Sequence, residues 1–148
     1  GIRINKKNAY DHIFGYTVLN DISARDLQRN HKQFFLGKSL PGACPIGPCI
    51  VTKDEIDDPH NLNISCKVNG KIKQESNTRY QIFDIPTQIE SISRSTYLMP
   101  GDIIATGTPS GVGFARTPPE FLKDGDMVEC EIENIGRIMN KIVNCSHQ

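Results

Sequence analysis

The sequence predicts an α+β fold that is mostly β, with a few short helices. The first observation is a clean alternation of apolar and polar side chains over residues 62–68, which is typical of a half-buried strand. The second is the Asn69-Gly70 pair that follows directly, which favours a type I′ turn and therefore a hairpin. The third is that every helical pattern is short. Together they indicate an α+β or β-roll architecture and not a doubly wound sheet.

The expected strands are short and separated by turn signals. Residues 57–59, Asp-Asp-Pro, mark a turn, and residues 134–136 lie between the two strands of a final hairpin. The expected strands cover residues 16–19, 49–52, 62–68, 71–75, 102–106, 127–132 and 138–143.

Three short helices are expected between these strands. Residues 8–13 carry a weak helical pattern. Ser23 is typical of a helix N-cap, and Asp26 three residues later completes a capping box for a helix that ends near residue 30. Pro86 suits the first turn of a third helix. The apolar stripe of that helix is Ile85, Ile89 and Ile92.

Composition excludes several classes of function. The 148 residues correspond to one domain. The 17 Lys and Arg residues balance 17 Asp and Glu residues, so the net charge is zero and binding to nucleic acid is not expected. The same balance gives no attraction to an anionic membrane. No apolar run approaches the roughly 20 residues that a bilayer span needs.

The five cysteines predict free thiols. Their number is odd and no Cys-x-x-Cys pair occurs, which excludes a complete disulfide framework and argues against a zinc site. We expect buried or half-buried thiols, and reduced thiols suit the cytosol or the mitochondrial matrix. The positions are Cys44, Cys49, Cys66, Cys130 and Cys145.

Two familiar catalytic motifs are absent. The Gly-Lys-Ser at residues 37–39 lacks the preceding glycine of a phosphate-binding P-loop. Ser110 lacks the flanking glycines of a serine-hydrolase elbow, because Thr108 and Val112 stand in their places.

Polar residues gather where the first apolar strand ends. Asp21 ends the strand, and Arg25 and Gln28 share one face of the helix that follows. Such a junction suits a hard divalent cation at Asp21 and an anionic oxygen ligand at Arg25. From the spacing alone, a simple Asp21–Arg25 ion pair on a solvated helix face is favoured over a binding site.

A second polar segment covers residues 99–113. There an apolar stretch runs into a loop with three glycines, which allow backbone N–H groups to approach a ligand closely. Thr106 and Thr108 offer hydroxyl groups in the same loop. The alternative interpretation is a tight, irregular crossover.

Taken together, these segments resemble the fumarylacetoacetate hydrolase family. The family signature is Asp-x-[Ser/Thr]-Ala-Arg-Asp-x-Gln, then Gly-Lys-[Ser/Thr], then Pro-Gly-Asp-x-Ile-x-Thr-Gly-Thr-Pro-x-Gly-Val-Gly. All three parts occur here in order, at residues 21–28, 37–39 and 100–113. The resemblance covers essentially the whole chain, and segments such as residues 118–126 look most similar to one animal subgroup of the family.

The resemblance implies a mixed β-roll or β-sandwich catalytic domain with a few short helices, usually a homodimer. It also implies a bound Mg²⁺, or Mn²⁺ or Ca²⁺ in its place. The residues that match family positions are Asp21 as a metal ligand, Lys38 as the catalytic lysine, and Arg25, Gln28 and Thr108 as substrate contacts.

Other family positions have no counterpart in the sequence. The Glu-x-Glu metal pair of the family would fall just before Gly1, and none of the four histidines matches the catalytic histidine. We therefore expect residues 1–148 to be a single fumarylacetoacetase-like catalytic domain that lacks its N-terminal strands.

The implied activity is that of a metal-dependent hydrolase or tautomerase acting on a small dicarbonyl acid. Three reactions share this chemistry: hydrolysis of a C–C bond in a β-diketone or acylpyruvate, decarboxylation of oxaloacetate, and its keto–enol tautomerisation. The motifs do not choose among them. The alternative is a catalytically inactive, truncated paralogue with a structural or partner-binding role.

Overall fold

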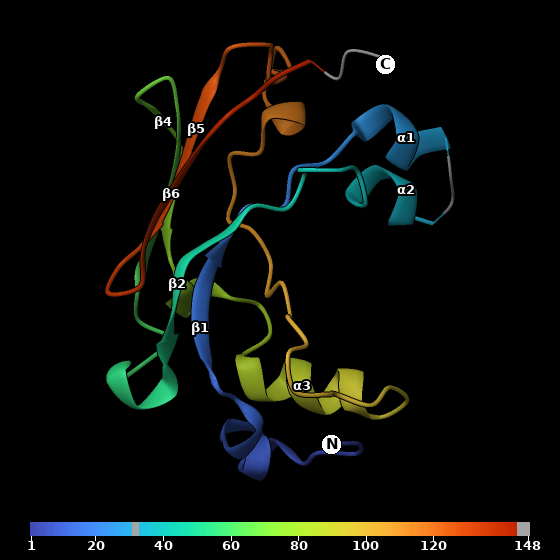
Figure 1. The fold of residues 1–148 in the computed structure, drawn as a ribbon, viewed down its shortest axis with the longest axis vertical. Helices are drawn as coiled ribbons and strands as arrows, with labels where there is room; N and C mark the ends of the chain where they lie inside the picture. The colour runs from blue at the N-terminus through green and yellow to red at the C-terminus, as the bar shows by residue number, and fades with distance from the viewer. Residues whose placement is uncertain (31–32, 145–148) are drawn as a thin grey trace.

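The computed structural model describes residues 1–30 and 33–144 and has a β-rich α+β fold (Figure 1). Within this described part, six strands form two antiparallel sheets, one of order β1-β2 and one of order β4-β3-β5-β6. The strands are β1 (Gly15–Leu19), β2 (Ile46–Thr52), β3 (Asn63–Val68), β4 (Lys71–Asn77), β5 (Met127–Ile132) and β6 (Gly136–Lys141).

The helices are all short, as expected. They are α1 (Arg25–Asn30), α2 (Phe35–Lys38) and α3 (Ile85–Ser93), with 3₁₀ turns η1 (Lys6–His12), η2 (Lys53–Glu55), η3 (Thr78–Tyr80) and η4 (Gly113–Ala115). The helix expected over residues 8–13 is thus the 3₁₀ turn η1, and α2 was not expected. Figure 1 shows α1 and α2 side by side beyond one end of β1 and β2, whereas α3 lies near the N-terminus at the other end. No helix in residues 1–30 and 33–144 is long and apolar enough to cross a membrane.

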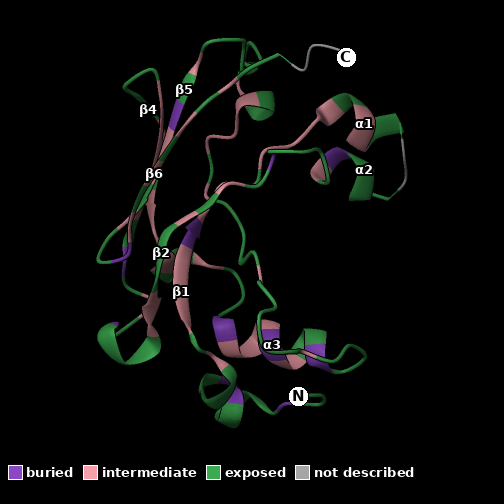
Figure 2. Cartoon of the chain, viewed as in Figure 1, coloured by how far each residue is buried: buried purple, intermediate pink, exposed green. Residues whose placement is uncertain are grey.

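The two sheets pack against each other around a small apolar core. β2 lies against β6, and β1 contacts both β5 and β6. The buried side chains of this core are Val18 on β1 and, from loops beside the strands, Ile56, Leu62 and Ile135. Figure 2 shows buried stretches on β1 and β5. This packing confirms the expected α+β fold of the β-sandwich type.

A second apolar cluster attaches α3 and η1 to the sheets. Its buried members are Ile4, Ala9, Ile85 and Ile89. Tyr16 on β1 packs against both clusters, and burial raises the pKa of its phenol to about 12. The two clusters are therefore linked through β1, the strand that leads to Asp21.

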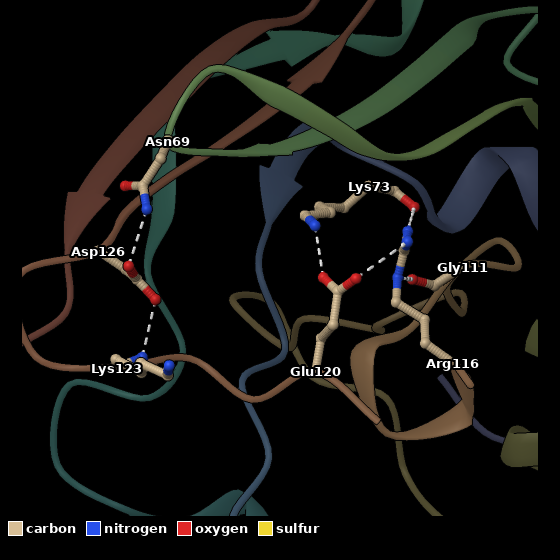
Figure 3. A network of polar contacts seen from close by, with 7 residues as sticks. All are labelled: Asn69, Lys73, Gly111, Arg116, Glu120, Lys123 and Asp126. Carbon is tan, nitrogen blue, oxygen red and sulfur yellow. Dashed lines mark hydrogen bonds and ion pairs between the residues drawn. The ribbon is translucent and has the colours of Figure 1, made fainter. Parts of the chain in front are cut away.

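The β3–β4 hairpin turns where the sequence predicts it. Asn69 and Gly70 have φ angles of 51° and 76°, as a type I′ turn requires at both positions. The Asn69 side chain also donates to Asp126 at 2.8 Å (Figure 3). The same side chain accepts from the Met127 N–H at 2.9 Å. These bonds fix the hairpin to the start of β5, and the Asn69 bond lowers the pKa of Asp126.

Three local expectations are wrong. Residues 102–106 are not a strand, because this extended segment has no ladder partner among the described residues; Ile103 is 57% exposed. The capping box is also wrong: the Ser23 hydroxyl donates to the Asp21 carbonyl oxygen, and α1 begins only at Arg25. The last strand spans Gly136–Lys141 and not 138–143.

The described cysteines are free thiols, as expected, but only two of them are half-buried. Cys66 and Cys130 lie opposite each other on β3 and β5, and a hydrogen bond between them, together with burial, raises the pKa of the Cys130 thiol. Cys44 and Cys49 are exposed, which corrects the expected burial. Cys145 lies outside the described residues.

Asp84 caps α3, and its removal should destabilise the protein. Its carboxylate accepts from the Thr87 N–H at 2.7 Å and from the Thr87 hydroxyl, and the latter bond lowers the pKa of Asp84. Asp84→Ala should cost about 1 kcal/mol of folding free energy, or roughly 2–4 °C in Tm. Thermal unfolding measures this, with exposed Asp57→Ala as the control.

The stabilisation of α3 by the Asp84 cap should depend on pH. Because the pKa of Asp84 is lowered on folding, its contribution is present above the unfolded pKa and is lost as pH falls through the folded value. The difference in Tm between wild type and Asp84→Ala should therefore shrink on acidification below about pH 4. A constant difference at all pH values would show that the carboxylate does not act as a cap.

Candidate active site

Asp21 and Lys38 form an ion pair at the end of β1. The Asn20 and Ile22 N–H groups donate to the Pro45 and Ala43 carbonyls at 3.1 and 3.0 Å, which fixes the backbone on both sides of Asp21. The Lys38 ammonium donates to the Asp21 carboxylate, and their side chains remain 31% and 43% exposed. The Asp21–Arg25 pair favoured by spacing is wrong, because Lys38 takes that place.

Gly37 allows α2 to bring Lys38 close to Asp21. The Ala24 N–H donates to the Gly37 carbonyl at 2.9 Å. A Cβ atom at residue 37 would lie 2.9 Å from the Ala24 carbonyl oxygen and 2.9 Å from the Gln28 Cβ. Such contacts are too short, so only glycine permits this approach of α1 and α2.

Gly37→Ala should therefore damage the site more than the fold. The added methyl group pushes α2 away from α1 and displaces Lys38, at a cost of about 1–3 kcal/mol. We expect kcat/KM to fall at least tenfold. Gly42→Ala is the control, because φ there is +74° but a Cβ meets nothing within 4 Å. It should lower Tm through backbone strain and leave kcat/KM unchanged; equal losses of kcat/KM in both variants would contradict this role of Gly37.

Arg25 is held in place from two sides. Its guanidinium donates to the Gln28 side-chain oxygen at 2.7 Å, which confirms that the two share a helix face. It also lies over the Phe114 ring, 4.3 Å from the centroid. Phe114 is not among the residues predicted from the sequence, although it directly follows the glycine-rich motif. This contact brings the two polar segments of the sequence together.

Thr108 lies in the glycine-rich loop and contacts a different element. Its hydroxyl accepts from the side chain of Gln74 on β4 at 2.9 Å. In the described residues, no hydrogen bond or ion pair joins Thr108 to the other four predicted site residues. The structure thus joins Asp21 with Lys38 and Arg25 with Gln28, and it holds the loop residue Thr108 against Gln74 of β4.

The residues at this site suit a divalent cation only in part. The Asp21 carboxylate is an oxygen ligand of the kind that Mg²⁺, Mn²⁺ and Ca²⁺ take. One carboxylate does not make a site, however. Among residues 1–30 and 33–144, no three His, Cys, Asp or Glu side chains come together in a way that could hold a metal. A cation at Asp21 needs further oxygen ligands from elsewhere.

The fold and these motifs define a member of a known enzyme family. The family model described as fumarylacetoacetate (FAA) hydrolase C-terminal matches residues 1–143, and the chain belongs to this family. It is 53% identical over 142 residues to the oxaloacetate tautomerase YisK of Bacillus subtilis, and the aligned region covers 96% of this chain and 47% of YisK.

The animal subgroup expected from the sequence is confirmed. The chain is 52% identical over 145 residues to the mitochondrial oxaloacetate tautomerase FAHD2A of Bos taurus, and the aligned region covers 97% of this chain and 46% of FAHD2A. This chain therefore spans about half the length of these relatives.

Solved structures agree with this assignment. A fumarylacetoacetate hydrolase from Exiguobacterium antarcticum superposes with a TM-score of 0.94 at 45% identity, over 97% of this chain and 51% of the other. Maleylpyruvate hydrolase from Sphingobium sp. SYK-6, solved with manganese(II) and pyruvate, superposes with a TM-score of 0.83 at 36% identity. The superposition covers 96% of this chain and 48% of the hydrolase.

Proposed function

We propose that this chain carries the catalytic residues of an enzyme that interconverts the keto and enol forms of oxaloacetate. The observation that carries the proposal is the Lys38–Asp21 pair at the strand end, next to the helix that bears Arg25 and Gln28. The two named relatives, 52–53% identical over nearly the whole chain, are oxaloacetate tautomerases, which supports this choice among the three expected reactions.

Each proposed residue has a chemical task. Enolisation places negative charge on a carbonyl oxygen, and Lys38 would donate to that oxygen from a fixed position. Arg25, held by Gln28 and Phe114, would bind a carboxylate with its planar guanidinium. Thr108 would donate a hydrogen bond to a further oxygen of the substrate. These contacts stabilise the charge distribution of the enolate more than that of the ketone.

We also propose that Asp21 supplies one ligand to Mg²⁺, or to Mn²⁺ or Ca²⁺. The cation, when bound, would polarise the substrate carbonyl as a Lewis acid. The manganese complex of the Sphingobium relative supports a divalent metal in the family. Residues 1–148 are proposed to form one catalytic domain, which the match over residues 1–143 supports.

The test is an enzyme assay on the protein's full chain. With oxaloacetate and Mg²⁺ or Mn²⁺, we expect the enol absorbance to relax faster than in a metal-only control, with no release of pyruvate. An acylpyruvate is assayed in parallel, since the similarity to maleylpyruvate hydrolase favours C–C hydrolysis as the second candidate. Cleavage of the acylpyruvate without faster enol relaxation would reject the tautomerase. Inactivity on both would favour the inactive paralogue, which the relatives do not support.

We further propose a homodimer. Several large apolar side chains in the described residues are exposed, which is typical of surfaces that another chain covers. Among them are Ile82 at 91%, Phe14 at 74% and Tyr80 at 73%. Light scattering on the purified full chain should give twice the mass of one chain, and the mass of one chain would reject the dimer.

The proposed compartment is the mitochondrial matrix or the cytoplasm. The bovine relative is named mitochondrial, and the described cysteines are free thiols, as a reducing compartment favours.

A further inference from the structure

Gln74 on β4 is a polar side chain that the proposed chemistry does not yet use. Its amide nitrogen lies 2.9 Å from the Thr108 hydroxyl oxygen and 2.7 Å from the Pro109 carbonyl oxygen. Gln74 is half-buried and precedes Thr108 by 34 residues, so the contact depends on the fold and not on the local sequence.

The orientation of the Gln74 amide follows from its partners. A carbonyl oxygen only accepts hydrogen bonds, so the Gln74 nitrogen, and not its oxygen, must face Pro109. This nitrogen carries two hydrogens, and the second is available to Thr108. The Thr108 hydroxyl oxygen is therefore the acceptor, and its own proton must point away from Gln74.

The loop that carries Thr108 and Pro109 is fixed to β4 by a second set of contacts. The Arg116 guanidinium donates to the Gly111 carbonyl at 3.1 Å and also to the carbonyl of Lys73, the neighbour of Gln74 (Figure 3). Glu120 accepts from the Lys73 ammonium and lies 3.7 Å from Arg116. In Figure 3, the Glu120 carboxylate stands between Lys73 and Arg116.

Gly111 shows how closely the loop lies on the strand. Its φ angle is +99°, and a Cβ atom there would lie 2.3 Å from the Lys73 carbonyl oxygen. No side chain fits in that space. Because backbone contacts and charged groups hold the loop on β4, the Gln74–Thr108 contact has a defined geometry.

We propose that Gln74 is a positioning residue that sets the direction of the Thr108 hydroxyl proton. With its oxygen occupied by Gln74, Thr108 presents its O–H as a donor to a substrate oxygen that only accepts, such as a carboxylate or an enolate. The inference rests on the proposed function, since it takes Thr108 to be a substrate contact. It assigns Gln74 to binding through Thr108, without contact to the substrate.

The test compares two replacements of Gln74 in the full chain. Gln74→Glu has the same shape, but its carboxylate accepts the Thr108 proton and turns it away from the substrate. Gln74→Met removes the hydrogen bond and leaves the hydroxyl free to rotate. We expect kcat/KM for oxaloacetate to fall roughly 30-fold or more in Gln74→Glu and about threefold in Gln74→Met, mainly through KM. A loss in Gln74→Met equal to or larger than that in Gln74→Glu would overturn the proposal.

Gln88 offers a matched control. It is also half-buried, and its amide nitrogen donates to the Phe83 and Thr106 carbonyls at 2.9 and 3.4 Å, with no hydroxyl involved. Gln88→Glu therefore disturbs a similar attachment near the start of the same loop. It should change Tm as much as Gln74→Glu does and leave KM within about twofold.

A double-mutant cycle separates positioning through Thr108 from other effects. In a Thr108→Val background no hydroxyl remains to be turned, so Gln74→Glu should reduce kcat/KM far less than it does in wild type. Equal reductions in both backgrounds would show that Gln74 does not act through Thr108.

A binding measurement keeps this inference separate from the proposed function. Calorimetry with oxalate and Mg²⁺, which needs no turnover, should show the same order of affinities: wild type, then Gln74→Met, then Gln74→Glu. If wild type binds oxalate in this order but does not act on oxaloacetate, the proposed function fails and the role of Gln74 stands. If oxalate does not bind, or binds all three equally, the role of Gln74 is rejected.

Discussion

Lys38→Met should lower kcat for oxaloacetate tautomerisation by roughly 10²-fold or more, the scale of losing one preorganised charged donor. Methionine keeps an apolar stem of similar length and removes the ammonium group that faces the Asp21 carboxylate. Because the enolate charge develops on the way to the transition state, the loss should appear in kcat more than in KM.

Folding stability should change little in the same variant. The Lys38 and Asp21 side chains are 31% and 43% exposed, and ion pairs between exposed side chains contribute at most about 1 kcal/mol. Lys67 is a matched control, because its side chain is 32% exposed and its ammonium bonds Glu129 at 2.9 Å on the sheet. Lys67→Met should leave kcat unchanged. Near-normal turnover by Lys38→Met would remove Lys38 from the mechanism.

Elements that depend on adjacent residues could be predicted from the sequence. The β3–β4 turn is the clearest case, because Asn69 and Gly70 both need a positive φ and both adopt one. The strand expected over residues 62–68 follows from its alternation and is found over Asn63–Val68, with Leu62 buried in the core just before it. In the same way, Arg25 and Gln28 meet because residues three apart on a helix always face the same side.

Contacts between distant residues could not be predicted in this way. Residues 102–106 have the apolar character of a strand, but a strand also needs a partner, which no local pattern supplies. The ion-pair partner of Asp21 is Lys38, 17 residues away, because Gly37 lets α2 pack on α1. Spacing rules compare only neighbours on one helix and therefore favoured Arg25.

In the candidate site, too, some residues could be predicted from the sequence, whereas the contacts that hold them could not. The residue patterns pointed to Asp21 and Thr108, and the family resemblance added Lys38, but neither indicated which residues hold these side chains in place. Phe114 and Gln74 are visible only once the glycine-rich loop is placed against α1 and β4. Residues that position a catalytic group are thus the part of a site that depends most on the three-dimensional structure.

Asp21→Asn should weaken the binding of Mg²⁺ or Mn²⁺ to the full chain more than tenfold. Asparagine keeps the size of the side chain and one acceptor oxygen, but the cation loses an anionic ligand. No three His, Cys, Asp or Glu side chains of the described residues lie together as possible ligands, so no other cluster in this part of the chain can take over the metal. Titration calorimetry of wild type and variant measures the difference.

Two control variants show whether the loss of metal affinity comes from the carboxylate of Asp21 itself. Asp21→Asn removes the carboxylate and also breaks the ion pair with Lys38, whereas Lys38→Met breaks the same ion pair but keeps the carboxylate. Metal affinity should therefore be unchanged or stronger in Lys38→Met, because a competing cation is gone. Asp11→Asn, an exposed aspartate on η1, controls for a general change of net charge. Equal metal affinities for wild type and Asp21→Asn would show that Asp21 is not a ligand, and its carboxylate would then serve only to hold Lys38.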